Sequence, residues 1–248
     1  MQKMNEQQRT QLLTSIAISS GHPSISPTSI TSQQRSEAFT NLEQFKTYPQ
    51  RIAICIDMIS ATSISFNTSL CTTGVVDVTV STKLYALSII KDFLKLDYNN
   101  LNVNDRLQIR TSILVAAQQL CTTSSGTGAT NGITNDSSGG ESKIMDPSTR
   151  ILAVKIASLL ADLALREFPQ RWTTFVTDLF SLWNVSCSTS TGNSGEGGNN
   201  NNTIGVKICL ECLKLITEDC TDSDYNARVS VVFFMLFVCV FIAYGGCF

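Results

Sequence analysis

Apolar residues recur at steps of three and four along five stretches of the chain, and no other feature limits its fold as strongly. This spacing places the apolar side chains on one face of an α-helix. Each such face must be covered by a neighbouring element, so the sequence predicts an all-α fold. The five stripes consist of Leu84, Leu87, Ile90 and Leu94; Leu107, Leu114, Ala117 and Leu120; Leu152, Ile156, Leu159 and Leu163; Trp172, Phe175, Val176, Leu179, Leu182 and Trp183; and Ile208, Cys212 and Leu215.

Signals for the starts and ends of helices agree with these stripes. Asp146-Pro147 places a capping carboxylate before a proline at the first helical position. Asn102 and Asp105 form a similar capping pair ahead of the second stripe. Phe168-Pro169 predicts a break, because the residue before a proline is pushed out of the helical conformation. The helices on either side of this break are expected to form an antiparallel hairpin.

Three tracts rich in Ser, Thr, Gly and Asn interrupt the stripes. They run over Ser19–Ser32, Thr122–Ser142 and Ser186–Asn202. Such segments bury too little apolar surface to offset their ordering entropy, so we expect mobile loops. The stretch from Ser60 to Val80 is rich in Thr and Val, which favour strands. Since its surroundings are helical, we interpret it as a loop as well.

The helix pairs recur at a regular interval once the tracts are set aside. Pairs are predicted to begin near Thr82, Pro147 and Thr203. Without the intervening tracts these starts lie roughly 40 residues apart, near the roughly 40–47 residue period of HEAT-type helix pairs. The sequence therefore predicts an α-solenoid of antiparallel HEAT-type helix pairs with low-complexity loop insertions.

The chain is therefore expected to have three parts. Residues 1–32 are expected to be a mobile N-terminal segment with one possible helix. Residues 33–228 would hold the helical repeats, with disordered inserts at 122–142 and 186–202. Residues 229–248 form an apolar tail.

Composition argues against an enzyme and against a nucleic-acid binder recognised by charge. Lys and Arg number 18 against 20 Asp and Glu, so the whole chain has no basic footprint. The one histidine, His22, lies in a Ser/Pro-rich stretch where a rigid partner for a nucleophile is not expected. No phosphate-binding glycine motif is present. We therefore expect no catalytic residues and no cofactor.

The cysteines fit a helical core better than a metal site. Cys209 and Cys212, with Cys220 and Cys187 nearby, could form a zinc knuckle, which needs four ligands. Cys209 and Cys212 share the stripe of Ile208, however, so we interpret them as core residues and expect no metal. Nine cysteines at irregular spacings and no secretory signal indicate a reducing compartment. Trp172 and Trp183 could stack on bases, but their continuous apolar stripe favours core packing.

One segment carries a family likeness. Residues 166–172, in which Glu167, Phe168 and Pro169 precede Trp172, resemble a motif of the exportin branch of the importin-β superfamily. In that family an acidic-aromatic-proline turn ends one helix of a repeat, and a tryptophan opens the next. The other segments that resemble the family are 34–38 and 42–46, 85–93 with Leu101 and Arg106, and 215–219 and 222–226, the last two being most similar to the exportin-five group of double-stranded-RNA exporters.

The resemblance implies a nuclear transport receptor that shuttles between nucleus and cytoplasm. Its implied partners are the GTP form of the Ran GTPase, a small structured RNA or protein cargo, and nuclear pore components. Members are typically several times longer than this chain, so the sequence would correspond to the Ran-proximal start. In the family, the second helices of the first repeats contact Ran.

Exposed charges on those helices are the candidate contacts with Ran. They are Arg106 and Arg110 on one predicted helix and Asp178 on the next. The plainer interpretation is a solvated helix face, since exposed charges usually do nothing specific.

The final segment departs from the family pattern. Residues 229–244 are uncharged and follow Arg228. A helix of that length spans about 24 Å, and one that reaches Phe248 spans about 30 Å, the thickness of a bilayer core. Three interpretations stay open, namely a gene-model artefact, a tail anchor and a buried core helix. The alternative function that follows is a membrane-tethered helical scaffold, and only then would a membrane be a partner.

Overall fold

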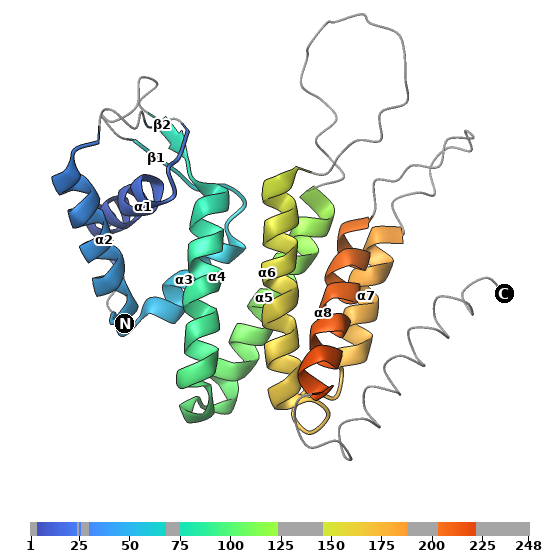
Figure 1. The fold of residues 1–248 in the computed structure, drawn as a ribbon. Helices are drawn as coiled ribbons and strands as arrows, with labels where there is room; N and C mark the ends of the chain where they lie inside the picture. The colour runs from blue at the N-terminus through green and yellow to red at the C-terminus, as the bar shows by residue number, and fades with distance from the viewer. Residues whose placement is uncertain are drawn as a thin grey trace, which may run out of the picture. The chain divides into compact units, whose positions relative to one another are not determined.

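A computed structural model shows an all-α protein, as the stripes predict, with one small sheet (Figure 1). The structure describes residues 4–23, 25, 30–67, 75–123, 146–187 and 203–221. The chain divides into two compact units, Met1–Ser112 and Ile113–Phe248. The described elements are α1 (Glu6–Ser19), α2 (Ser32–Lys46), α3 (Arg51–Ser60), β1 (Ser65–Asn67), β2 (Val75–Asp77), α4 (Thr79–Leu96), a 3-10 turn η1 (Tyr98–Asn100), α5 (Val103–Thr123), α6 (Pro147–Glu167), α7 (Phe175–Cys187) and α8 (Thr203–Thr221).

In the first unit α1 packs against α2, α3 packs against α4, and α1 also touches α4. α1 begins with a capping box in which Asn5 and Gln8 satisfy each other's backbone N–H groups. Its inward face buries Leu12, Leu13 and Ile16. α1 corresponds to the one possible helix expected within residues 1–32, and its buried apolar face packs it against α2 and α4.

The stretch predicted as a loop between Ser60 and Val80 contains a short antiparallel sheet. β1 and β2 pair with Phe66 opposite Val76, and both of these side chains are buried while their neighbours are exposed. The backbone N–H of Val78 donates to the carbonyl of Ile64 at 2.9 Å and extends this pairing. The loop prediction is therefore wrong for residues 65–67 and 75–77, where the β-branched residues form strands despite the helical surroundings.

α5 confirms the predicted helix but corrects its buried face. Asn102 caps it as expected, accepting from the backbone N–H of Asp105 at 2.9 Å. Its buried face carries Ile109 and Ile113, whereas Leu107 is 47% exposed. Of the predicted stripe, Ala117 is buried, Leu114 and Leu120 are half-buried and Leu107 is exposed, so the stripe overlaps the buried face only in part.

The second unit is built around α8, which packs against both α6 and α7. In Figure 1, α8 lies between α6 and α7. α6 begins as predicted, since Asp146 accepts from the backbone N–H of Thr149 at 3.1 Å ahead of Pro147. The starts of α6 and α8 coincide with the predicted Pro147 and Thr203, and α4 starts three residues before Thr82. The stripe of α6 is confirmed, since all four of its residues are buried.

The expected hairpin across Phe168-Pro169 needs correction. The close pairings in this unit are α6 with α8 and α7 with α8, and no comparably extensive pairing of α6 with α7 is found. α6 and α7 are instead linked by the aromatic turn described below.

The apolar tail at 229–248, and most of the predicted inserts at 122–142 and 186–202, lie outside the described residues. Among the helices that the structure describes, none combines the length and the apolarity that crossing a bilayer requires.

Candidate functional site

The turn between α6 and α7 is the most specific motif of the sequence, and its backbone forms a closed structure. α6 ends at Glu167, and Phe168 takes an extended conformation with ψ of 142°. The carbonyl of Glu167 then accepts from the backbone N–H groups of Arg171 at 2.7 Å and Trp172 at 3.1 Å. These bonds satisfy a carbonyl that the end of the helix would otherwise leave without a partner. Glu167 itself is only 3% exposed.

Aromatic side chains fill the inside of this turn. The ring of Trp172 meets that of Phe175 edge-on with centroids 4.8 Å apart, and Phe168 lies 5.7 Å from Phe175. Trp172 is 1% exposed. The prediction that it packs in the core is confirmed. Its expected place on one helix face with Trp183 is wrong, because α7 starts only at Phe175 and Trp172 belongs to the turn.

Asp178 belongs to the same turn, although the sequence indicates an exposed charge. Its Oδ2 accepts from the indole Nε1–H of Trp172 at 2.7 Å and from the hydroxyl of Thr174 at 3.0 Å. The carboxylate thus ties the first turn of α7 to the aromatic cluster. Its charge is also favourable near a helix N-terminus. Among the three predicted partner contacts, Asp178 therefore has a clear role within the fold.

Arg106 has a comparable role in the first unit. Its guanidinium lies over the ring of Tyr98, 5.4 Å from the centroid, and its Nη2 donates to the carbonyl of Asn99 at 2.8 Å. Tyr98 is buried. Arg106 therefore holds the 3-10 turn η1 against the start of α5. Asp178 belongs to the second unit, whereas Arg106 and Arg110 belong to the first.

Arg110 lies beside two exposed apolar side chains, Val103 and Leu107. The sequence predicted Leu107 to be a core residue and gave no indication of a role for Val103. Val103, Leu107 and Arg110 follow one another at steps of four and three, so they share one face of α5. Val103 is 78% and Leu107 is 47% exposed, and Arg110 is half-buried. We call these three residues the α5 face. An exposed apolar stripe beside an arginine is a composition typical of partner surfaces.

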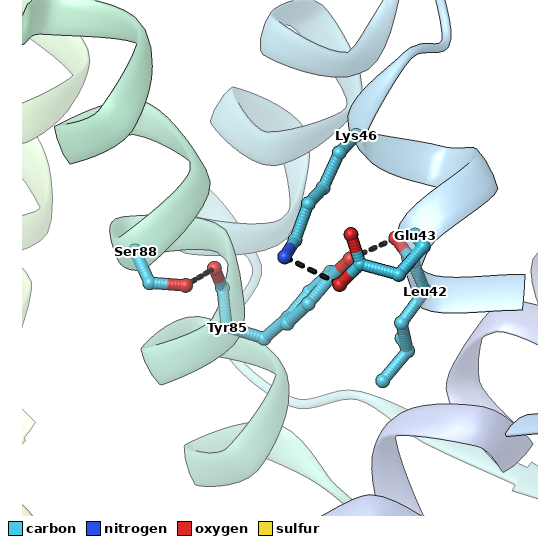
Figure 2. A network of polar contacts seen from close by, with 5 residues as sticks. All are labelled: Leu42, Glu43, Lys46, Tyr85 and Ser88. Atoms are coloured by element: carbon cyan, nitrogen blue, oxygen red, sulfur yellow. Dashed lines mark hydrogen bonds and ion pairs between the residues drawn. The ribbon is translucent and has the colours of Figure 1, made fainter. Parts of the chain in front are cut away.

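A polar network joins α2 to α4 in the first unit (Figure 2). The hydroxyl of Tyr85 donates to the carbonyl of Leu42 at 3.0 Å, and the hydroxyl of Ser88 donates to the carbonyl of Tyr85 at 2.7 Å. Glu43 and Lys46 form an ion pair at 2.6 Å beside it. Burial, with the Cys55 thiol and the Glu43 carboxylate adding to it, raises the pKa of Tyr85 well above its usual value. Tyr85 therefore stays a neutral hydrogen-bond donor.

The cysteines behave as core residues where their side chains are described. Cys209 and Cys212 are buried, and the Sγ–H of Cys209 donates to the carbonyl of Leu179 at 3.2 Å. Burial raises the pKa of the Cys212 thiol, and Cys209 and Asp162 add to this effect. Within the described part of the chain no three His, Cys, Asp or Glu side chains gather as a metal site would require. The side chains of Cys187 and Cys220 lie outside it.

The described residues form a helical protein whose notable features are the aromatic turn between α6 and α7 and the exposed apolar side chains on α5. Residues 149–230 match the family described as Exportin 1-like protein. This match covers about a third of the chain and contains all but the first two residues of α6, the aromatic turn, α7 and α8. It supports the resemblance to the exportin class. Neither a curated protein nor a solved structure matches the chain.

Proposed function

We propose that the chain acts as an exportin-like nuclear transport receptor that binds the GTP form of Ran and a cargo. The observation that carries this proposal is the match to the exportin family over residues 149–230, because it contains the Phe168-Pro169 turn and the Trp172 core. A small structured RNA or a protein is the proposed cargo. Shuttling between nucleus and cytoplasm through nuclear pore contacts, and the exportin-five grouping, belong to the same proposal.

The physical basis for such a receptor is the stacking of HEAT-type helix pairs. Each pair leaves apolar surface for its neighbours to cover, so stability and curvature are shared along the stack. If Ran and cargo both favour one curvature, each raises the affinity for the other by the same factor. The packing of α8 against both α6 and α7 supplies the kind of helix-to-helix contact that this mechanism requires.

The α5 face is the proposed Ran contact. Val103 and Leu107 offer apolar area that a partner can bury, at about 25 cal/mol per Å². Arg110 adds a planar donor that can pair with a carboxylate of the partner. Arg106 supports this surface from inside by fixing η1, and Asp178 is assigned to stability of α7.

Binding of the full chain to Ran loaded with a non-hydrolysable GTP analogue tests this assignment. Leu107→Ser with Arg110→Ala should weaken binding about tenfold or more, as expected for central interface residues. Leu210→Ser is the matched control, because Leu210 is 52% exposed on α8 and lies outside the α5 face. Equal affinity of the double variant and the control would contradict the assignment, and absence of any binding to Ran would contradict the proposed function.

A further inference from the structure

A groove of about 680 Å³ lies between α1 and α2, and four of its eleven lining residues carry side-chain amides. Gln7 and Gln11 line it from α1, and Gln34 and Asn41 line it from α2. Ala38, which is buried, contributes only a methyl group at this wall. Among its described lining residues none is lysine or arginine, whereas Glu6 and Glu37 both line it.

The amides of the groove are partly fixed by hydrogen bonds across the two helices. The Nε2–H of Gln11 donates to Oδ1 of Asn41 at 3.2 Å, and the Nδ2–H of Asn41 donates to the hydroxyl of Ser15 at 3.2 Å. The Ser15 hydroxyl in turn donates to the carbonyl of Gln11 at 2.8 Å. This series of hydrogen bonds fixes the side chains of Gln11 and Asn41 before any ligand binds. It leaves Oε1 of Gln11, and the whole amide of Gln7, without a hydrogen bond to the described residues.

These groups match the chemistry of a polypeptide backbone. A side-chain amide carries both a donor and an acceptor, as a peptide group does. The α1 lining extends from Glu6 to Ile18, which corresponds to about 18 Å of helix. At about 3.3 Å per residue, an extended chain of five or six residues fills that length.

The charge of the groove selects among peptides. Glu6 and Glu37 are exposed, with Gln33 donating to Oε1 of Glu37 at 2.9 Å. Two carboxylates without a lining cation attract lysine or arginine side chains and repel the phosphates of a nucleic acid. We propose that the α1–α2 groove binds an extended segment of a partner protein, about five or six residues long, that carries lysine or arginine.

The probe is a fluorescein-labelled octapeptide in which serine and lysine alternate, with blocked ends, titrated with the full chain at low salt. The wild-type chain should bind it saturably and should not bind the matching peptide of serine and glutamate. Glu6→Gln with Glu37→Gln should weaken binding about three- to tenfold, the range of two partly exposed charge pairs. Gln11→Leu should weaken it without a change in charge. Glu43→Gln is the matched control, because Glu43 lies on α2 outside the groove lining.

Several outcomes overturn the proposal. They are the absence of saturable binding, equal binding of the glutamate peptide, and a loss in Glu43→Gln as large as that in the double variant. Competition by a short RNA as effective as that by unlabelled lysine peptide would also overturn it. Since none of these measurements involves Ran, they fail or succeed independently of the proposed function.

Discussion

Replacing Asp178 by alanine tests whether the turn between α6 and α7 is held as the structure describes. The substitution removes the acceptor of the buried Trp172 indole N–H, at 2.7 Å, and that of the Thr174 hydroxyl, at 3.0 Å. The helix itself should tolerate it, because alanine has the highest helix propensity. Any loss of stability therefore reports the carboxylate contacts.

The magnitude follows from the two hydrogen bonds. A bond to a charged group contributes about 1.5–3 kcal/mol when its partner is buried, and Trp172 is 1% exposed. The bond from Thr174 contributes less, since Thr174 is exposed and water replaces the acceptor. We expect Asp178→Ala to lower the free energy of unfolding by about 2–3 kcal/mol. A double-mutant cycle that combines Asp178→Ala with Trp172→Phe should give an interaction free energy of about 1–2 kcal/mol between the two side chains.

Urea unfolding followed by tryptophan fluorescence is the appropriate assay. Both tryptophans, Trp172 and Trp183, lie in the second unit, so the signal reports that unit. Glu218→Ala serves as the control, because this carboxylate is 58% exposed and lies on α8. If Asp178→Ala changes the free energy of unfolding by less than about 0.5 kcal/mol, as the control does, the reasoning is refuted and Asp178 is a solvated surface residue.

Two further predictions concern the first unit, which includes α5 as far as Ser112. Ile109→Ala should lower the free energy of unfolding by about 2–5 kcal/mol, because Ile109 is 1% exposed. Leu107→Ala should change it by about 0.5 kcal/mol or less, because Leu107 is exposed. Equal losses of stability in thermal denaturation of the two variants would contradict the observed orientation of α5. Burial, opposed in part by Arg51, raises the pKa of the Cys55 thiol to about 12. Since the unfolded thiol ionises near pH 8.5, stability present below that pH should fall as the pH rises toward 12. Urea midpoints at pH 8 and 10.5 should differ less in Cys55→Ala, and an unchanged difference would refute the role of Cys55.

Local signals predicted the helices α4 to α8, whereas no apolar stripe was identified for α2 or α3. Asp146 and Pro147 fixed the start of α6 because a cap and a proline act within one turn of the backbone. The α6 stripe could be read because leucine, isoleucine and alanine occupy its buried positions without a competing apolar face. The all-α class followed from these features.

Orientation was harder to predict where a helix has two apolar faces. α5 carries Leu107 and Leu114 on one side and Ile109 and Ile113 on another, so periodicity alone cannot choose between them. Only the neighbours of α5 decide which face is buried. The small sheet was missed for a similar reason, because three-residue strands are too short to give a period.

The predicted site residues depended on contacts that sequence spacing does not encode. Asp178 lies six residues from Trp172, a separation that no regular helix brings into hydrogen-bond contact. Arg106 reaches back seven residues to Asn99 because η1 and the start of α5 fold on each other. The sequence proximity of Arg106 to Tyr98, next to the capping residue Asn102, was the one signal that could have predicted this contact. The amide groove became visible only when α1 and α2 were placed together.

The proposal that this chain acts as an exportin-like receptor is tested most directly by measuring whether its binding to Ran depends on the bound nucleotide. Isothermal titration of the full chain with Ran carrying a non-hydrolysable GTP analogue, and separately with Ran carrying GDP, measures this dependence. The account predicts saturable binding of the GTP-analogue form and at least about tenfold weaker binding of the GDP form, a difference of about 1.4 kcal/mol. Equal affinities for the two forms, or no binding of either, would contradict it.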